Sequence, residues 1–304
     1  MMMITNPGRA LALVVGLAVA AAAGAQTAPP AAAPAKAATA AKPAKPAKKA
    51  PSGQVKPIVE QRALDLLRAT SARLAAAKSM SFTATVGYEY PSKFGPPIVY
   101  TTRYDVTMQR PDKLRILMPG DGPASEFYYD GKTMMAYAPA ENLAAVADAP
   151  PTIGAALLAA FKSASIYFPF SDVLVADPYT AMAEGVKLAF YVGPSAVVGG
   201  AKTEMIVWAN NDVFVQMWIG ADDKLPRRMR AMFAADPLGL RHEMEFSNWQ
   251  LDPVVPPEAF VSAKAQAAGR MAFKAPGPPP RGAKPIIKGD APAKAPAKSA
   301  PKPN

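Results

Sequence analysis

The chain has 304 residues, no cysteine, a single histidine and a formal net charge of +11. Outside residues 58–274 there are thirteen basic residues and one acidic residue, which leaves a net charge of about −1 for residues 58–274. The high overall charge therefore gives no support to a basic groove for nucleic acid in this segment, and we predict no nucleic-acid partner. Its length suffices for one hydrophobic core, and without cysteine that core does not depend on disulfides.

The first 25 residues have the pattern of a secretory signal peptide. Arg9 precedes an apolar run, residues 10–23, and the small residues Ala23, Gly24 and Ala25 follow. The run is too short to span about 30 Å of hydrocarbon comfortably, which argues against a membrane anchor. We therefore predict export to the periplasm of a Gram-negative cell and cleavage after Ala25.

Residues 26–57 and 275–304 consist mostly of alanine, proline and lysine. Such segments lack the large apolar side chains that offset the entropy of ordering, so we predict that both are disordered. Solvated spacers and tethers to an anionic envelope surface are both consistent with their positive charge. The predicted organisation is a signal peptide (1–25), a linker (26–57), a single folded domain (58–274) and a tail (275–304).

The folded segment begins with a helix and continues as strands. Apolar residues recur at helical spacing within residues 58–77, and apolar and polar side chains then alternate strictly along residues 82–90. The further strands predicted before the next helix are residues 98–108, residues 114–118, the two arms of a hairpin around Asp130-Gly131, and residues 143–147.

Asp130-Gly131 separates two short runs that are rich in aromatic residues and methionine. Asp-Gly suits a two-residue type I′ turn because glycine tolerates positive φ freely and aspartate does so better than most residues. A loop of that length places Tyr129 opposite Lys132 and Phe127 opposite Met134. The sequence therefore predicts a tight hairpin at this position.

An apolar helix is predicted over residues 153–161, and Ser171 and Asp177 are candidate caps of two further helix starts. Five more strands are predicted, at residues 186–192, 203–208, 213–219, 227–234 and 240–249. About ten strands exceed what an open twisted sheet holds easily without curling. We predict an α+β fold in which a strongly curved antiparallel sheet forms an incomplete barrel with helices on its concave side.

The sequence offers little catalytic chemistry. His242 lies in a strand pattern, and no second histidine or cysteine can join it in a zinc site or a nucleophilic pair. No glycine-rich phosphate loop and no serine-centred elbow occurs. We therefore expect no catalytic residue, no metal and no cofactor, and predict that the protein is not an enzyme.

An excess of apolar side chains is the more informative signal. Residues 213–219 are apolar on both alternating faces, and methionines recur through the strands. Strands covered on both sides have this pattern, and methionine both fills irregular cores and adapts to apolar guests. A methionine-rich core and an apolar cavity both explain it. The residues predicted to line a cavity are Phe82, Val86, Tyr88, Tyr100, Tyr104, Val106, Met108, Met134 and Met217.

Several short motifs occur in combination along the folded segment. They are RPDKLR at 110–115, FYYDGKT at 127–133, DPY at 177–179 and WQLDP at 249–253. Together they resemble the DUF2092 family of predicted periplasmic proteins, which is similar in fold to the lipoprotein carriers LolA and LolB. The resemblance implies an incomplete antiparallel barrel with an α-helical lid, and a lipid or the acyl chain of a lipoprotein as ligand. It implies no established activity and no particular site residues.

Two functions remain open on the sequence. The first is a periplasmic, non-enzymatic binding protein that carries or senses a lipid or acylated ligand in an apolar half-barrel cavity. The second is a structural or interaction protein of the envelope, with a fully plugged barrel and basic tails that tether it. A hydrolase is a distant third, because no residue pattern supports it.

Overall fold

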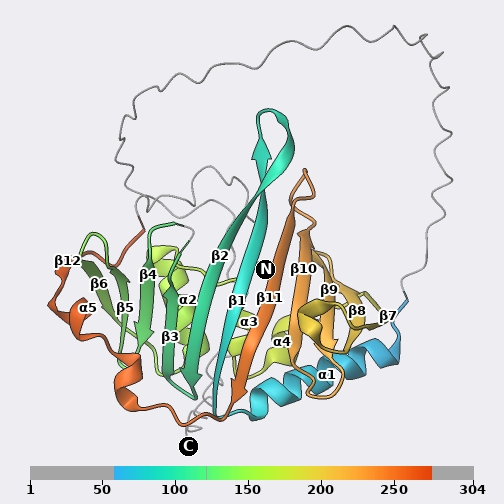
Figure 1. Ribbon diagram of the computed structural model, residues 1–304, viewed down its shortest axis with the longest axis horizontal. Helices are drawn as coiled ribbons and strands as arrows, with labels where there is room; N and C mark the ends of the chain where they lie inside the picture. Colours follow the sequence, from blue (N-terminus) through green and yellow to red (C-terminus); the bar gives the residue numbers. More distant parts are fainter. Residues whose placement is uncertain (1–57, 121, 276–304) are drawn as a thin grey trace, which may run out of the picture. The chain divides into compact units, whose positions relative to one another are not determined.

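The computed structural model describes residues 58–120 and 122–275 (Figure 1). The predicted signal peptide and its cleavage site, the linker 26–57 and the tail 275–304, except Ala275, lie outside the described residues.

The described residues form a twelve-stranded sheet in the order β12-β6-β5-β4-β3-β2-β1-β11-β10-β9-β8-β7 (Figure 1). All neighbouring strands are antiparallel except β12 and β6, which are parallel. The sheet is not closed, because β12 and β7 are its two edges. The strands are β1 (Ser79–Ser92), β2 (Gly95–Gln109), β3 (Lys113–Met118), β4 (Ser125–Tyr129), β5 (Thr133–Ala138), β6 (Leu143–Asp148), β7 (Leu188–Ser195), β8 (Thr203–Ala209), β9 (Val213–Gly220), β10 (Pro226–Phe233), β11 (Arg241–Leu251) and β12 (Gly269–Met271).

The helical elements are α1 (Gln61–Ala76), α2 (Ile153–Ala164), α3 (Ser171–Leu174), α4 (Pro178–Ala183), α5 (Ala263–Ala267), and the 3-10 turns η1 (Val198–Gly200) and η2 (Pro257–Phe260). Asp177 caps α4 as predicted, because its carboxylate accepts a hydrogen bond from the Thr180 amide at 3.0 Å. Ser171 does not cap α3; it is the first residue of that helix and is buried. Within the part of the chain that the structure describes, no helix is long and apolar enough to cross a membrane.

The main core lies between one face of the sheet and helices α1 to α4. One cluster of buried side chains joins Leu67 and Leu74 of α1 and Leu157 of α2 to strand residues such as Phe82 and Met217. Alternating strand residues point to opposite faces, so this cluster defines the helix-covered face of the sheet. The alternation read from the sequence along β1 is confirmed here, since Phe82 and Val86 are buried.

A second, smaller core lies on the opposite face of the sheet. Tyr128, Met135 and Tyr137 of β4 and β5 pack there with Ala265 and Ala268. These alanines belong to the C-terminal segment that contains α5 and β12. This segment crosses the second face before β12 pairs with β6. Sequence reasoning missed β12, because it has only three residues and all three are exposed.

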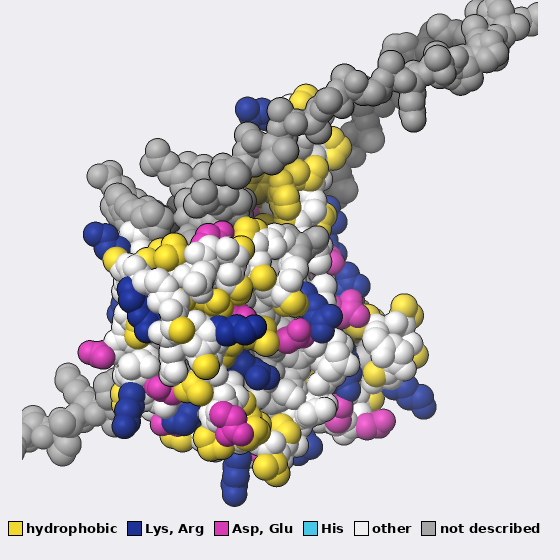
Figure 2. Space-filling model, turned by 60° about the vertical axis from the view of Figure 1, so that its left-hand side comes forward, with side chains coloured by type: hydrophobic (Ala, Val, Ile, Leu, Met, Phe, Trp, Pro, Cys, Tyr) yellow, Lys and Arg dark blue, Asp and Glu magenta, His cyan; other side chains and the backbone are white. Residues whose placement is uncertain are grey.

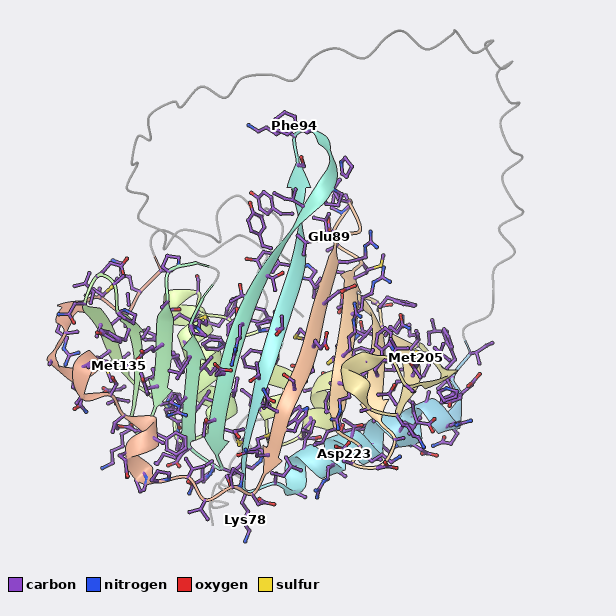
Figure 3. All side chains as sticks on the ribbon, viewed as in Figure 1. Lys78, Glu89, Phe94, Met135, Met205 and Asp223 are labelled. Carbon is purple, nitrogen blue, oxygen red and sulfur yellow. The ribbon has the colours of Figure 1, made fainter. Side chains whose placement is uncertain are left out.

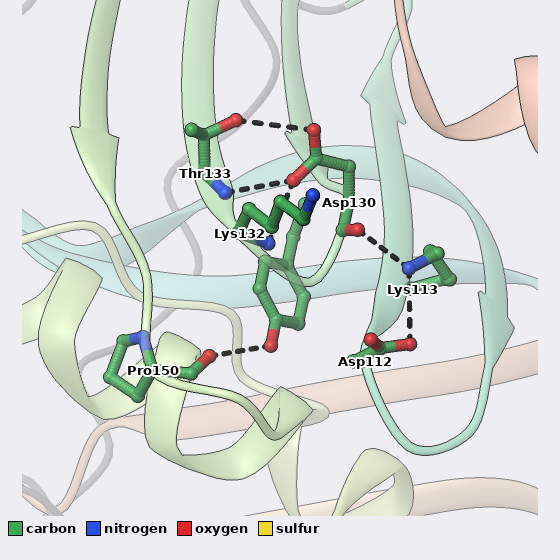
Figure 4. Close-up of polar contacts among 7 residues, drawn as sticks. Asp112, Lys113, Asp130, Lys132, Thr133 and Pro150 are labelled. Atoms are coloured by element: carbon green, nitrogen blue, oxygen red, sulfur yellow. Dashed lines mark hydrogen bonds and ion pairs between the residues drawn. The ribbon is translucent and has the colours of Figure 1, made fainter.

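The predicted Asp130-Gly131 hairpin exists, but its turn is shifted by one residue along the chain (Figure 4). Tyr129 lies opposite Met134, not Lys132, and the turn is centred on Gly131-Lys132. The Asp130 carboxylate accepts hydrogen bonds from the amides of Lys132, at 2.9 Å, and Thr133, at 2.8 Å. These local bonds make Asp130 the first residue of the turn and not a central one. The pairing changes by two residues, so every side chain keeps its predicted face.

Candidate functional site

All nine residues predicted to line a cavity lie on the helix-covered face. Along β1 and β2, Phe82 lies opposite Val106, Tyr88 lies opposite Tyr100, and directly opposed residues share a face. Met134 and Met217 lie on the same face, because each is connected to it by residues that lie directly opposite one another on successive strands. The first row of opposed residues is Met134, Tyr129, Leu114 and Met108, and the second is Met217, Met229, Met244 and Val86.

Six of the nine side chains are part of the packed core. Their exposed fractions are between 0 and 4% for Phe82, Val86, Val106, Met108, Met134 and Met217. The segment between α2 and α3 covers this region with the rings of Phe168 and Phe170. The Phe170 ring lies 5.7 Å from the Phe82 ring and 5.2 Å from the Tyr104 ring, and the Phe168 ring lies 6.3 Å from the Tyr104 ring. This part of the face is filled by protein.

The cover ends near Tyr104, and beyond it the same face is partly open. Tyr88 is half-buried and Tyr100 is 47% exposed. Tyr90 follows on β1. On the other side of Tyr88 lies His242 of β11, and Phe233 of β10 lies next to His242. We call Tyr88, Tyr90, Tyr100, Phe233 and His242 the aromatic ledge.

The rings of the aromatic ledge form a continuous series of contacts. Ring centres are 5.8 Å apart for Tyr90 and Tyr100, 6.1 Å for Tyr100 and Tyr88, 6.5 Å for Tyr88 and His242, and 5.0 Å for His242 and Phe233. Such spacing is within the range of stacked and edge-to-face aromatic pairs. Sequence reasoning missed Phe233 and His242 as members, because their place in this series depends on how β1, β10 and β11 pair across the sheet.

Burial favours the uncharged forms of Tyr88, Tyr104 and His242 by shifting the pKa of each side chain. Burial, and then the neighbouring Tyr88, raise the pKa of Tyr104 to about 12. Burial and Tyr100 also raise the pKa of Tyr88. Burial lowers the pKa of His242, against the opposing effect of Asp236 and Glu89. The site therefore presents phenols and a neutral imidazole, which suits contact with an apolar or uncharged ligand group.

The lowered pKa of His242 predicts a pH dependence of stability. The unfolded chain binds the proton more tightly than the folded one, so stability falls as the pH drops through about 6.5, the usual value for histidine. Because His242 is the sole histidine in the sequence, His242→Phe should remove this component. Urea unfolding of both proteins between pH 5 and 8 checks it. A stability difference between them that does not change with pH would contradict the prediction.

The opposite face of the sheet has an open depression of about 370 Å³, lined by Thr101, Arg103, Pro119 and Gly120. None of the nine predicted residues borders it. Among residues 58–120 and 122–275, no group of three or more histidine, cysteine, aspartate or glutamate side chains is placed to hold a metal ion.

Residues 63–274 match the family model described as "Predicted periplasmic protein (DUF2092)". The chain belongs to the DUF2092 family. The match covers the helix-covered core, the aromatic ledge and the C-terminal segment together. The resemblance inferred from the sequence motifs is thereby confirmed. The expected periplasmic location is confirmed as well, because the family is described as periplasmic.

Several solved structures are similar to this DUF2092 protein at low identity. The Mycobacterium tuberculosis lipoprotein LppX is 14% identical, with a TM-score of 0.41 over 65% of this chain and 99% of its own. LprF from Mycobacterium bovis is 16% identical, with a TM-score of 0.40 over 65% and 97%. A LolA superfamily protein from Nitrosomonas europaea is 10% identical, with a TM-score of 0.31 over 66% and 97%. No protein of curated function matches the sequence significantly.

Proposed function

We propose that this DUF2092 protein is a non-enzymatic periplasmic binding protein that carries or senses a lipid or acylated ligand. The apolar part of the ligand lies against the aromatic ledge. The observation that carries the proposal is the change in burial along one face of β1 and β2. Phe82 and Val106 are sealed beneath the helices, whereas Tyr100 on the same face is 47% exposed.

The proposal includes the shape of the domain, residues 58–274. The sheet curves into an incomplete barrel of the LolA type, and helices α1 to α4 occupy its concave side. The single cluster that joins these helices to one sheet face supports this arrangement. In this proposal the ligand space begins where the cover over the six sealed residues ends, and Tyr88, Tyr100 and Tyr104 form its accessible wall.

Uncharged aromatic rings are suited to such a ligand. Burying apolar surface releases about 25 cal/mol per Å², and tyrosine supplies a large apolar area with few rotatable bonds. Since the pKa values of Tyr88 and Tyr104 are raised, both phenols keep their protons at neutral pH and remain available as hydrogen-bond donors. A ligand with one polar end and a long apolar part matches these tyrosine side chains.

Replacing Tyr100 with alanine tests this function. We expect Tyr100→Ala to weaken the binding of a fluorescent fatty-acyl probe about tenfold, because the most exposed ring of the ledge is removed. Val99→Ala is the matched control, since Val99 is the preceding residue, is 63% exposed and lies on the opposite face. Fluorescence titration measures both. Equal affinities for the parent and Tyr100→Ala, or an equal loss in Val99→Ala, would argue against the ledge as the site.

The burial of six predicted residues favours a second function, an envelope interaction protein with a plugged barrel. In that case the basic segments 26–57 and 275–304 make the contacts with the envelope surface. A parent protein that binds no acyl probe, and that co-purifies with no lipid in native mass spectrometry, would support it.

A further inference from the structure

The hairpin formed by β1 and β2 extends beyond the strands on either side of it (Figure 1). β3 pairs with β2 only from Asp105 to Gln109, and β11 pairs with β1 only as far as Tyr88. Among the described residues, the outer part of the hairpin therefore has no neighbouring strand. β1 and β2 remain paired with each other out to Ser92 and Gly95, so this part is an ordered two-stranded ribbon.

The end of this ribbon is apolar and exposed. Phe94 lies at its tip and is 97% exposed (Figure 3). Ile98, Val99 and Tyr100 follow on β2, and each is exposed by about half or more. Figure 2 shows hydrophobic side chains gathered on this projecting part of the molecule. Single exposed apolar residues are ordinary, but a contiguous group at the end of a projection marks a contact site.

The charge of the ribbon is positive. No acidic residue occurs between Glu89 and Asp105, and Lys93 lies within this stretch. Arg103, at the inner end of the stretch, is paired with Asp105 at 3.0 Å and adds no unpaired charge. Glu89, at the base of the ribbon, is already paired with Arg241 at 3.0 Å. The tip therefore offers an aromatic ring and an adjacent lysine that has no ion-pair partner among the described residues, and its own stretch of chain carries no carboxylate that would repel an anionic surface.

These features fit a lipid surface better than a protein pocket. A standard protein interface buries about 800 Å² on each partner, which is more than a two-residue turn and its neighbours supply. A membrane interface accepts a small convex apolar group, with aromatic rings at the boundary and lysine near the lipid phosphates. We propose that the tip of the β1–β2 hairpin docks on an anionic phospholipid bilayer, with Phe94 among the acyl chains and Lys93 at the phosphates.

The proposal goes beyond ligand binding and does not depend on it. One ring and one lysine give a weak, reversible contact, since even a single myristoyl chain binds membranes only marginally. Tyr90 lies directly opposite Ile98, so the apolar surface continues from the tip to the aromatic ledge. A bilayer contacted by Phe94 would thus meet one end of the surface proposed to hold a lipid.

Vesicle flotation with the full exported chain tests the role of Phe94. We expect Phe94→Ser to weaken partitioning onto phosphatidylcholine vesicles about tenfold, because the ring no longer leaves water. Val254→Ser is the matched control, since Val254 is 98% exposed outside the hairpin. Uncharged vesicles exclude any contribution from the basic tails. Unchanged partitioning of Phe94→Ser would overturn the proposal.

The role of Lys93 is tested on vesicles of phosphatidylcholine and phosphatidylglycerol in a 3:1 ratio. Lys93→Ser should weaken binding about fivefold there and leave binding to uncharged vesicles unchanged. Lys78→Ser is the control, since Lys78 is an exposed lysine at the opposite end of the sheet (Figure 3). Equal losses in the two lysine variants would show an effect of total charge only and would overturn the assignment of Lys93.

A third measurement locates the tip directly. Phe94→Trp should be quenched by vesicles that contain brominated lipid, whereas the three native tryptophans of the parent protein should not. If Phe94→Trp is not quenched and Phe94→Ser instead changes the sedimentation of the protein, the tip is a protein contact and the proposal is wrong. Acyl-probe titration without vesicles reports separately on the aromatic ledge, so failure of one proposal is distinguishable from failure of the other.

Discussion

Replacing Phe82 with alanine should lower the free energy of unfolding by about 3–5 kcal/mol. The Phe82 side chain is 2% exposed, and its ring lies 4.5 Å from Trp249, 5.7 Å from Phe170 and 5.8 Å from Phe246. Truncation leaves a cavity between the sheet and the helices and removes three aromatic contacts. Chemical denaturation of the parent and the variant measures the loss.

Tyr100→Ala is the comparison for this experiment, because Tyr100 lies on the same face beyond the helical cover. We expect it to lower the free energy of unfolding by about 1 kcal/mol, since a half-exposed ring loses less burial than a sealed one. A similarly large loss for both variants would mean that the face is packed throughout and would favour the plugged-barrel function. A loss below about 1 kcal/mol for Phe82→Ala would mean that the helices leave space above it.

Gly131→Ala should destabilise the protein by about 2–3 kcal/mol. Gly131 has φ of +91°, a conformation that side chains with a Cβ rarely adopt. A Cβ atom at this position would also meet the Asp112 carboxylate and the Lys113 ammonium group. Lys113 donates a hydrogen bond to the Asp130 carbonyl at 2.6 Å and pairs with Asp112 at 3.2 Å, so it holds two turns together (Figure 4).

Gly185→Ala separates the two contributions. Gly185 also has positive φ, +70°, but nothing lies within 4 Å of where its Cβ would be. Its replacement should cost only the backbone strain, about 1 kcal/mol after the lower entropy of the unfolded chain is included. Thermal and urea unfolding of both variants give the comparison. Equal losses would show that the contact with Asp112 and Lys113 adds nothing.

Local sequence alone determined which side chains share a face. The alternation along β1 and β2 identified correctly which face carries the buried core residues, because successive residues of a strand point to opposite sides whatever the strand packs against. Asp177 followed by Pro178 likewise located the start of α4, since a helix cap is satisfied within a few residues. The family motifs also lie within the segment that the family model matches.

Only the tertiary structure decided how much of that face is covered. Phe82 and Tyr100 follow the same alternation, but Phe170, far away in the chain, lies against Phe82, whereas Tyr100 remains 47% exposed. His242 joins the aromatic ledge because β11 pairs with β1, although 148 residues (93–240) separate the two strands in sequence. Periodicity is a local property of the chain. Burial depends on which distant segment packs above each residue, and alternation along a strand carries no information about that.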